Sequence, residues 1–100
     1  MAATKEAKVK KRMKDILNEL EIYHFFPPAN GYGRAGIPDI VGCVNGKFIA
    51  IECKAGKGTT TALQDRELER ITAAGGYTFL VRETNVDGMK EALRCLKQTS

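Results

Sequence analysis

The feature that most constrains the fold of this chain is a pair of apolar runs joined by Asn45-Gly46, within the stretch GIPDIVGCVNGKFIAIECK (residues 36–54). Asn-Gly between apolar runs is a strong signal for a β-hairpin, because both residues readily take the positive φ angles of a two-residue type I′ turn. The stretch therefore predicts two antiparallel strands whose register is fixed by the turn.

That register brings two acidic residues together. If Val44 and Lys47 flank the turn, counting outward along both strands places Asp39 directly opposite Glu52. Their Cβ atoms would then lie about 4.5–5.5 Å apart. Because side chains alternate across a strand, both acids fall on the same face of the hairpin. That face is expected to carry Asp39, Val41, Cys43, Phe48, Ala50, Glu52 and Lys54, and the opposite face Ile40, Val44, Ile49, Ile51 and Cys53.

Two ionised carboxylates at this separation need a partner. At about 5 Å and an effective dielectric constant near 20, they repel by roughly 3 kcal/mol, a large fraction of the stability of a small domain. Three interpretations remain open from the residues alone. Lys54 could neutralise one acid as a structural ion pair, the acids could share a proton as an acid/base pair, or a divalent cation could lie between them.

The rest of the chain predicts three helices and one further strand. With 100 residues it is expected to form one domain, in the order α-β-β-α-β-α, with a mixed sheet covered by helices. The expected elements beside the hairpin are a helix over about 5–21, a helix from Thr60 or Thr61 to Ala74, a strand over 77–82 and a helix over about 86–97.

Each helix has an apolar stripe. The expected inward residues are Val9, Met13, Ile16, Leu17 and Leu20 in the first helix, Leu68, Ile71 and Ala74 in the second, and Val86, Met89, Leu93 and Leu96 in the last. Glu6 falls within about 40° of the centre of the first stripe, so this helix directs a carboxylate inward. Gln64 also faces inward from the second helix, either as a hydrogen-bonded amide or as a site residue.

The charge distribution alone favours a solvated helix face and is also compatible with a polyanionic partner. The net charge is +4, and residues 1–14 contain six basic residues against one acid. Such a basic helix is a solvated face in many proteins, but it is also the pattern expected of a nucleic-acid or membrane-surface binder. The chain has no apolar run near the roughly 20 residues of a membrane span, and no signal-peptide segment, so a cytoplasmic location is expected. Its three cysteines are expected to be small buried hydrophobic residues in a reducing compartment.

Two glycine-rich stretches do not form nucleotide-binding motifs. GxGxxG at Gly31 is preceded by prolines and followed by a strand, unlike the dinucleotide-binding fingerprint, and AGKGTTT lacks the first glycine of a phosphate-binding loop. The first stretch is instead expected to be a loop that carries Tyr32 and Arg34. His24 is expected to be a packed or solvated residue, not a catalytic one.

Taken together, the motifs resemble a known nuclease signature. Pro38-Asp39, followed after twelve residues by Glu52-x-Lys54, is similar to the PD-(D/E)xK pattern. With Glu6 on an opening helix, "GIPD", "IECK" and Gln64 on the next helix, residues 4 to about 82 resemble the small stand-alone VRR-Nuc nucleases. The resemblance implies a single restriction-endonuclease-like α/β domain over residues 1–100, and hydrolysis of branched or four-way junction DNA with Mg²⁺ or Mn²⁺ as cofactor.

The resemblance also implies roles for individual residues. Asp39 and Glu52 would be metal ligands together with the backbone carbonyl of Cys53, and Glu6 would assist through a water molecule. Lys54 would orient the nucleophile, and Glu6 and Gln64 would complete the catalytic site. The residues expected to bind DNA are Lys8, Lys11, Arg12, Tyr32, Arg34 and Lys57.

Two other functions are compatible with the same residues. The acids and Lys54 could form a structural ion cluster in a non-catalytic nucleic-acid-binding module that uses the basic helix. Alternatively, that helix could bind a membrane surface or a protein partner. Because resolving a branched junction takes two symmetric cuts, a homodimer is the expected assembly, and no membrane partner is expected.

Overall fold

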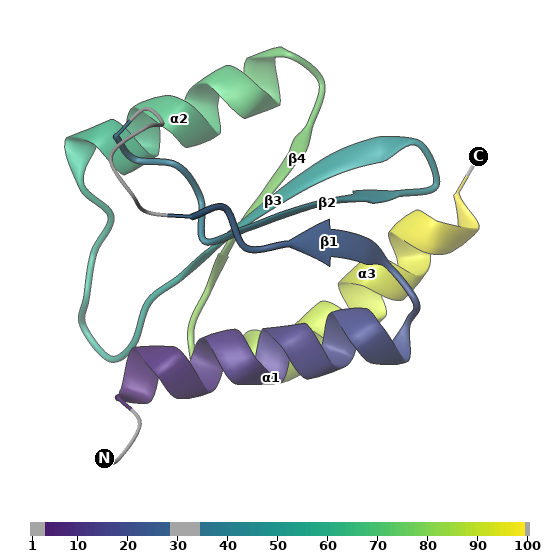
Figure 1. Cartoon of the computed structure of the whole chain (residues 1–100), viewed down its shortest axis with the longest axis horizontal. Coiled ribbons are helices and arrows are strands. Elements are labelled where there is room, and N and C mark those ends of the chain that lie inside the picture. Colours follow the sequence, from purple (N-terminus) through teal and green to yellow (C-terminus); the bar gives the residue numbers. More distant parts are fainter. Residues whose placement is uncertain (1–3, 29–34, 100) are drawn as a thin grey trace.

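The computed structural model describes residues 4–28 and 35–99 of the chain. Figure 1 shows one α/β unit in which four strands are combined with three α-helices and a short 3-10 helix. In chain order the elements are α1 (Lys5–Glu19), β1 (Tyr23–Phe25), β2 (Ile40–Val44), β3 (Lys47–Cys53), α2 (Ala62–Ala73), β4 (Tyr77–Val81), η1 (Val86–Gly88) and α3 (Met89–Gln98).

The sheet is mixed, as predicted, with the strand order β1-β2-β3-β4. The pairs β1–β2 and β2–β3 are antiparallel, and β4 runs parallel to β3. The predicted hairpin register is confirmed, because Val44 pairs with Lys47 and Ile40 pairs with Ile51. The turn residues Asn45 and Gly46 have φ angles of 50° and 80°, the sign that a type I′ turn requires.

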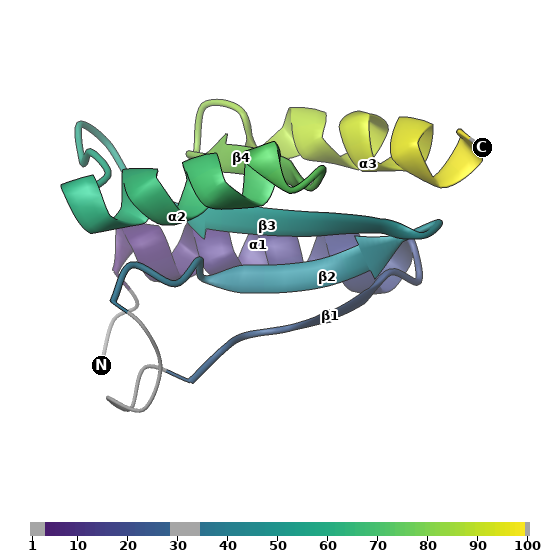
Figure 2. The same cartoon turned by 90° about the horizontal axis from the view of Figure 1, so that it is seen from above.

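Helices cover both faces of the sheet. In Figure 2, α1 and α2 lie on opposite sides of β3, and α3 extends along the same edge as β4. The core combines the α1 stripe with the predicted apolar face of the hairpin and with residues of β4, η1 and α3. Its members include Met13, Ile16, Leu17, Ile40, Ile49, Ile51, Val81 and Leu93. Within the described ranges, none of the helices combines the length and apolar character needed to cross a membrane.

The strand β1 was not predicted. The sequence analysis expected no strand between the first helix and the hairpin, but Tyr23–Phe25 pairs with β2 as an edge strand. Three residues are too few to show a periodicity, and the hydrogen bonds that define this strand come from a segment about twenty residues away. His24, also on β1, is half-buried, and its Nδ1 lies 2.8 Å from the carbonyl oxygen of Ile22, in agreement with a packed residue.

The helix ends follow local capping chemistry. Thr61 accepts a hydrogen bond from the backbone N–H of Gln64, and the Gln64 side chain accepts one from the N–H of Thr61, which completes a capping box for α2. The first helix ends at Glu19, two residues before the predicted end, because Leu20 caps it and Glu21 turns to a φ of 56°.

Several burial predictions were wrong. Ala74 is exposed, and the buried residue of α2 is Glu67, because this short helix packs on the sheet through its middle turns. Cys53 is buried as predicted, but Cys43 and Cys95 are exposed. Cys43 pairs with Phe48, whose own side chain is exposed, on a part of the hairpin face that α2 leaves open.

Candidate active site

The two acids predicted to face each other do so. Asp39 lies immediately before β2 and Glu52 lies near the end of β3, one pair beyond the Ile40–Ile51 pair of the hairpin. The side chain of Asp39 lies close enough to Glu52 for its charge and hydrogen-bonding capacity to raise the pKa of Glu52. The backbone N–H of Cys53 donates to Asp39 Oδ2 at 2.8 Å. Two carboxyl groups this close favour a shared proton or a cation between them.

Burial makes Glu52 the unusual member of the pair. Only 2% of the residue is exposed. Burial, followed by the hydrogen bond and the charge of Asp39, raises the pKa of Glu52 to about 8. Its Oε2 is buried and, within the described part of the chain, has no hydrogen-bond partner. An orphaned acceptor of this kind is costly, and it indicates a ligand that supplies the missing interaction.

A cation that contacts Asp39 is Lys10, which the sequence interpretation did not include among the site residues. Its Nζ lies 3.4 Å from Asp39 Oδ1 and 3.6 Å from Glu6 Oε2. Burial lowers the pKa of Lys10, but the charge and hydrogen bond of Asp39, together with Glu6, outweigh burial and raise it. The i, i+4 spacing of Glu6 and Lys10 on α1 could have suggested this contact.

Lys54 and Glu6 lie at the edge of the acid pair. Lys54 directly follows β3, is partly buried, and its charge lowers the pKa of Glu52 against the raising effect of burial. Glu6 is directed toward the site by the first turn of α1 and its charge acts on Glu52, although 42% of its side chain is exposed. The structure thus places both residues near the pair, and their catalytic roles stay predictions.

Gln64 stands at the start of α2, where its side-chain oxygen accepts the Thr61 N–H at 2.9 Å. The neighbouring loop before β2 packs closely on this helix start. A Cβ on Gly36, whose φ is +83°, would lie 2.4 Å from the carbonyl oxygen of Leu63. The side chain of Gln64 therefore caps α2, and its predicted place in the catalytic site stays a prediction.

The loop between β3 and α2, which carries Lys57, is held by residues that follow β4. Arg82 donates to the carbonyl oxygens of Gly56 and Gly58, and the N–H of Gly56 donates to Glu83 Oε1 at 2.7 Å. These contacts fix the base of the loop, and Lys57 itself is exposed.

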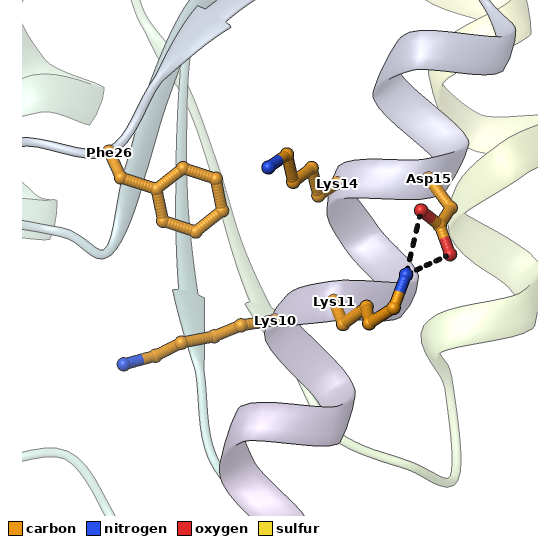
Figure 3. Close-up of a pocket in the computed structure, with 5 residues that line it drawn as sticks. All are labelled: Lys10, Lys11, Lys14, Asp15 and Phe26. Atoms are coloured by element: carbon orange, nitrogen blue, oxygen red, sulfur yellow. Dashed lines mark hydrogen bonds and ion pairs between the residues drawn. The ribbon is translucent and has the colours of Figure 1, made fainter. Parts of the chain in front are cut away.

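A basic groove adjoins the acids. A cavity of about 510 Å³ lies between α1 and the chain that follows β1, lined by Lys10, Lys11, Lys14, Asp15 and Phe26. Figure 3 shows the Phe26 ring facing the helix, with the Lys14 side chain extending toward it. Lys10 lines this groove and also contacts Asp39, so this one side chain lies between the groove and the acid pair.

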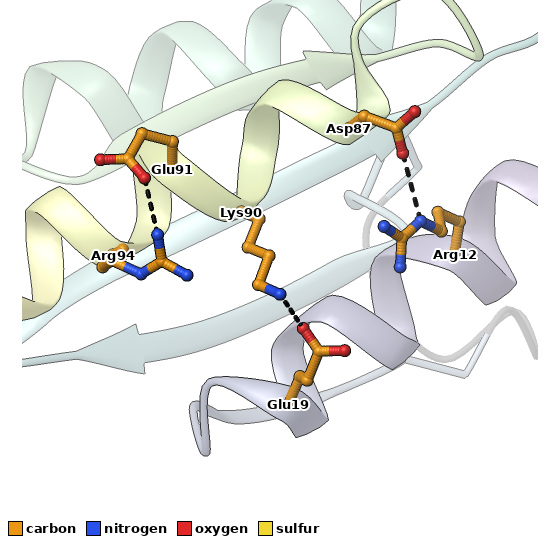
Figure 4. Close-up of polar contacts among 6 residues, drawn as sticks. All are labelled: Arg12, Glu19, Asp87, Lys90, Glu91 and Arg94. Atoms are coloured by element: carbon orange, nitrogen blue, oxygen red, sulfur yellow. Dashed lines mark hydrogen bonds and ion pairs between the residues drawn. The ribbon is translucent and has the colours of Figure 1, made fainter.

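The predicted DNA-binding residues of α1 are exposed, and two of them are paired. Lys11 forms an ion pair with Asp15 at 3.4 Å, and Arg12 reaches Asp87 of η1 at 3.2 Å. Figure 4 shows this second contact beside the Lys90–Glu19 ion pair, which joins α3 to α1, and the Arg94–Glu91 pair within α3. Lys8 is exposed. The predicted contacts of Tyr32 and Arg34 fall outside the described residues.

The acid pair fits a hard divalent cation with few protein ligands. Among residues 4–28 and 35–99, no group of three or more His, Cys, Asp or Glu residues could hold a metal ion. Mg²⁺, however, commonly uses one or two carboxylates and completes its shell with water and phosphate oxygens. The Oε2 atom of Glu52, which has no partner among the described residues, is a carboxylate oxygen that could serve as such a metal ligand. Burial raises the pKa of the Cys53 thiol to about 12, which favours the neutral thiol in the metal-free protein.

Comparison with known proteins gives the same class of enzyme. The family model of the archaeal Holliday junction resolvase (Hjc) matches residues 2–89. "Putative nuclease p44" of Acyrthosiphon pisum secondary endosymbiont phage 1 is 35% identical over 72 residues, which cover 71% of this chain and 73% of the relative. These matches support a nuclease with a restriction-endonuclease-like fold, but not the VRR-Nuc family in particular. The chain belongs to the archaeal Holliday junction resolvase family of nucleases.

Proposed function

We propose that this protein is a divalent-metal-dependent endonuclease that hydrolyses phosphodiester bonds in branched DNA such as four-way junctions. The observation that carries the proposal is the acid pair: Asp39 lies beside Glu52 and raises its pKa, and a buried oxygen of Glu52 has no partner among the described residues. The name of the matching family supports junction DNA as the substrate.

Asp39, Glu52 and the backbone carbonyl of Cys53 would hold Mg²⁺ or Mn²⁺, and Glu6 would contribute through a water molecule. The metal would supply electrostatic stabilisation of the phosphate and a more acidic bound water. The protein would keep the two carboxylates in place through the hairpin register and through the hydrogen bond from Cys53 N–H to Asp39.

Three further residues would act on the reacting groups. The ammonium of Lys54, beside the pair, would orient the attacking water or stabilise the negative charge that develops on the phosphate. Gln64 would complete the site from the start of α2, where its amide nitrogen remains free of the capping bond made by its oxygen. Glu6 should affect cleavage more than DNA binding, because it points toward the acids instead of the DNA-binding face.

The exposed face of α1 would bind the DNA backbone through Lys8, Lys11 and Arg12, and the loops would contribute Lys57, Tyr32 and Arg34. Replacing the three α1 residues by Ala should weaken binding to all DNA sequences alike and flatten its salt dependence, because fewer counterions are released. A loss of affinity confined to one sequence would contradict a phosphate-binding role.

Cleavage assays test the proposal directly. Plasmid and four-way junction DNA are incubated with the protein in Mg²⁺, Mn²⁺ or EDTA, with Asp39→Asn as the inactive control. Cleavage in either metal that is absent in EDTA and in the variant is the expected result. A non-catalytic binding module would instead retain DNA in a salt-sensitive manner and leave it uncut under all conditions.

We further propose that the active form is a homodimer, because two symmetric cuts are needed to resolve a junction. The exposed aromatic side chains of the edge strand, Tyr23 and Phe25, with Phe26 beside them, offer an apolar surface for such an interface. Light scattering at micromolar concentration decides the question. A mass of about 11 kDa together with intact junction cleavage would show that the dimer is unnecessary.

Two finer expectations belong to the same proposal. The resemblance to the small stand-alone VRR-Nuc nucleases predicts cutting that depends on the branched shape of the DNA more than on its sequence. A DNA substrate, and the likeness to a nuclease of a phage, are consistent with action inside a cell.

A further inference from the structure

The Lys10 ammonium occupies a central position among the acids of the site. It lies within 3.6 Å of Glu6 Oε2 and 3.4 Å of Asp39 Oδ1, and so bridges the first turns of α1 to the residue that opens the hairpin. The remaining acid, Glu52, lies beside Asp39 at the end of the hairpin. In the metal-free protein, Lys10 therefore supplies the positive charge that a bound metal would otherwise supply.

A divalent cation and this ammonium cannot both stay on Asp39 without strong repulsion. The repulsion between charges of the same sign is large at contact distances in a partly buried site. Only 34% of the Lys10 side chain is exposed, so water screens it incompletely. Metal binding at the acid pair would therefore push the ammonium away from Asp39.

The structure provides a place for the displaced ammonium. Lys10 already lines the basic groove with Lys14 and Phe26, and its flexible four-carbon stem allows the ammonium to turn without a change in the helix. Figure 3 shows the Lys10 side chain extended below the Phe26 ring and away from Asp15, in the pose in which its Nζ contacts Asp39. In the groove, a second free ammonium beside Lys14 would favour a phosphate group of DNA.

We propose that Lys10 is a displaceable internal counter-ion: it neutralises Glu6 and Asp39 in the metal-free protein, and metal binding releases it to contact a DNA phosphate in the adjoining groove. The inference rests on the proposed metal-dependent function, and it makes Lys10 a positioning residue that couples metal binding to DNA binding.

The first part of the proposal, that Lys10 and the metal compete for the acids, is tested by measuring metal affinity without DNA. Mn²⁺ is titrated calorimetrically into the wild-type protein, Lys10→Gln, Lys10→Arg and Lys11→Gln. The Lys11 variant is the matched control, since Lys11 is the next residue of α1 but pairs with Asp15 and not with the site. We expect Lys10→Gln to bind Mn²⁺ about tenfold more tightly, which corresponds to about 1.4 kcal/mol, while Lys10→Arg stays near the wild type. The Lys11 variant should change affinity by less than about twofold.

Two results would overturn this half. Equal Mn²⁺ affinity of Lys10→Gln and wild type would show that the ammonium does not compete with metal. Equal tightening in the Lys10 and Lys11 variants would show a general effect of net charge. Asp39→Asn is the control that should lose Mn²⁺ binding. If the wild-type protein itself binds no Mn²⁺, the proposed metal-dependent function is refuted. This result differs from a failure of the Lys10 proposal, in which the wild type binds Mn²⁺ and Lys10→Gln binds it equally well.

The salt dependence of DNA binding tests the second half, using a four-way junction built with hydrolysis-resistant phosphorothioate linkages. The measured quantity is the slope of the logarithm of DNA affinity against the logarithm of salt concentration. In EDTA, this slope should be nearly the same for Lys10→Gln and wild type, because Lys10 is held by the acids. In Mg²⁺ its slope should be shallower than that of wild type by about one, the effect of a single lost phosphate contact. Lys11→Gln should change the slope equally in both media. A Lys10 effect of the same size in EDTA and Mg²⁺ would refute the release of the ammonium.

Discussion

The buried carboxyl of Glu52 should make the stability of the metal-free protein fall as the pH rises from about 5 to about 8. Glu52 is 2% exposed and its pKa is raised from 4.5 to about 8, first by burial and then by Asp39. Below pH 4.5 this carboxyl is protonated in both the folded and the unfolded chain. Between the two pKa values only the unfolded chain loses the proton, which favours unfolding, and above pH 8 the effect is complete.

The magnitude follows from the two pKa values. One pKa unit corresponds to about 1.4 kcal/mol, so a carboxyl with a pKa of 4.5 in the unfolded chain and about 8 in the folded protein lowers the free energy of unfolding by about 5 kcal/mol at pH 8 and above. This loss is comparable with the total stability of many small domains. Glu19 and Glu83 have lowered pKa values, so their effect on stability appears below pH 4.5, outside this window.

The assay is urea unfolding in EDTA at several pH values from 5 to 9, for wild type and for Glu52→Gln. The variant keeps the shape of the side chain but cannot ionise, so its stability should lack most of the decline and should exceed that of wild type at pH 8. Saturating Mg²⁺ should restore wild-type stability at that pH, because a ligand that binds only the folded state stabilises it. If the two proteins lose stability in parallel across the window, Glu52 is not the titrating group and the reasoning is wrong.

Three further predictions concern the surroundings of the pair. Lys54→Ala should keep Mn²⁺ affinity in calorimetry but lose turnover on junction DNA, and a cleavage rate near that of wild type would make Lys54 structural. Gly36→Ala should destabilise the protein by more than about 2 kcal/mol in urea unfolding, because its φ of +83° is strained for alanine and its Cβ would meet the Leu63 carbonyl oxygen at 2.4 Å. Thr61→Ala should lower the free energy of unfolding by about 1 kcal/mol through loss of the cap shared with Gln64, and an unchanged midpoint would show that the capping box contributes nothing.

Local chemistry allowed much of the site to be predicted from the sequence. The Asn45-Gly46 turn has only one two-residue register with its flanking strands, so the approach of Asp39 to Glu52 follows from counting residues. The apolar stripe of α1 predicted its buried face, because a helix repeats every 3.6 residues whatever it packs against. The Thr61 cap and the glycines after α2 are likewise short-range signals.

The features that the sequence did not reveal depend on contacts between distant segments. Strand β1 exists because β2 offers it hydrogen bonds, and Cys43 is exposed because α2 does not extend over it. Lys10 is one of several lysines on a basic helix. Its i, i+4 spacing from Glu6 suggests an ion pair with that acid, but not the contact with Asp39 across the end of the sheet. The sequence by itself determined that two carboxylates would face each other. Only the tertiary structure decided which cation lies beside them and that one of their oxygens is buried without a partner among the described residues, because burial and charge pairing depend on how the helices pack around the hairpin.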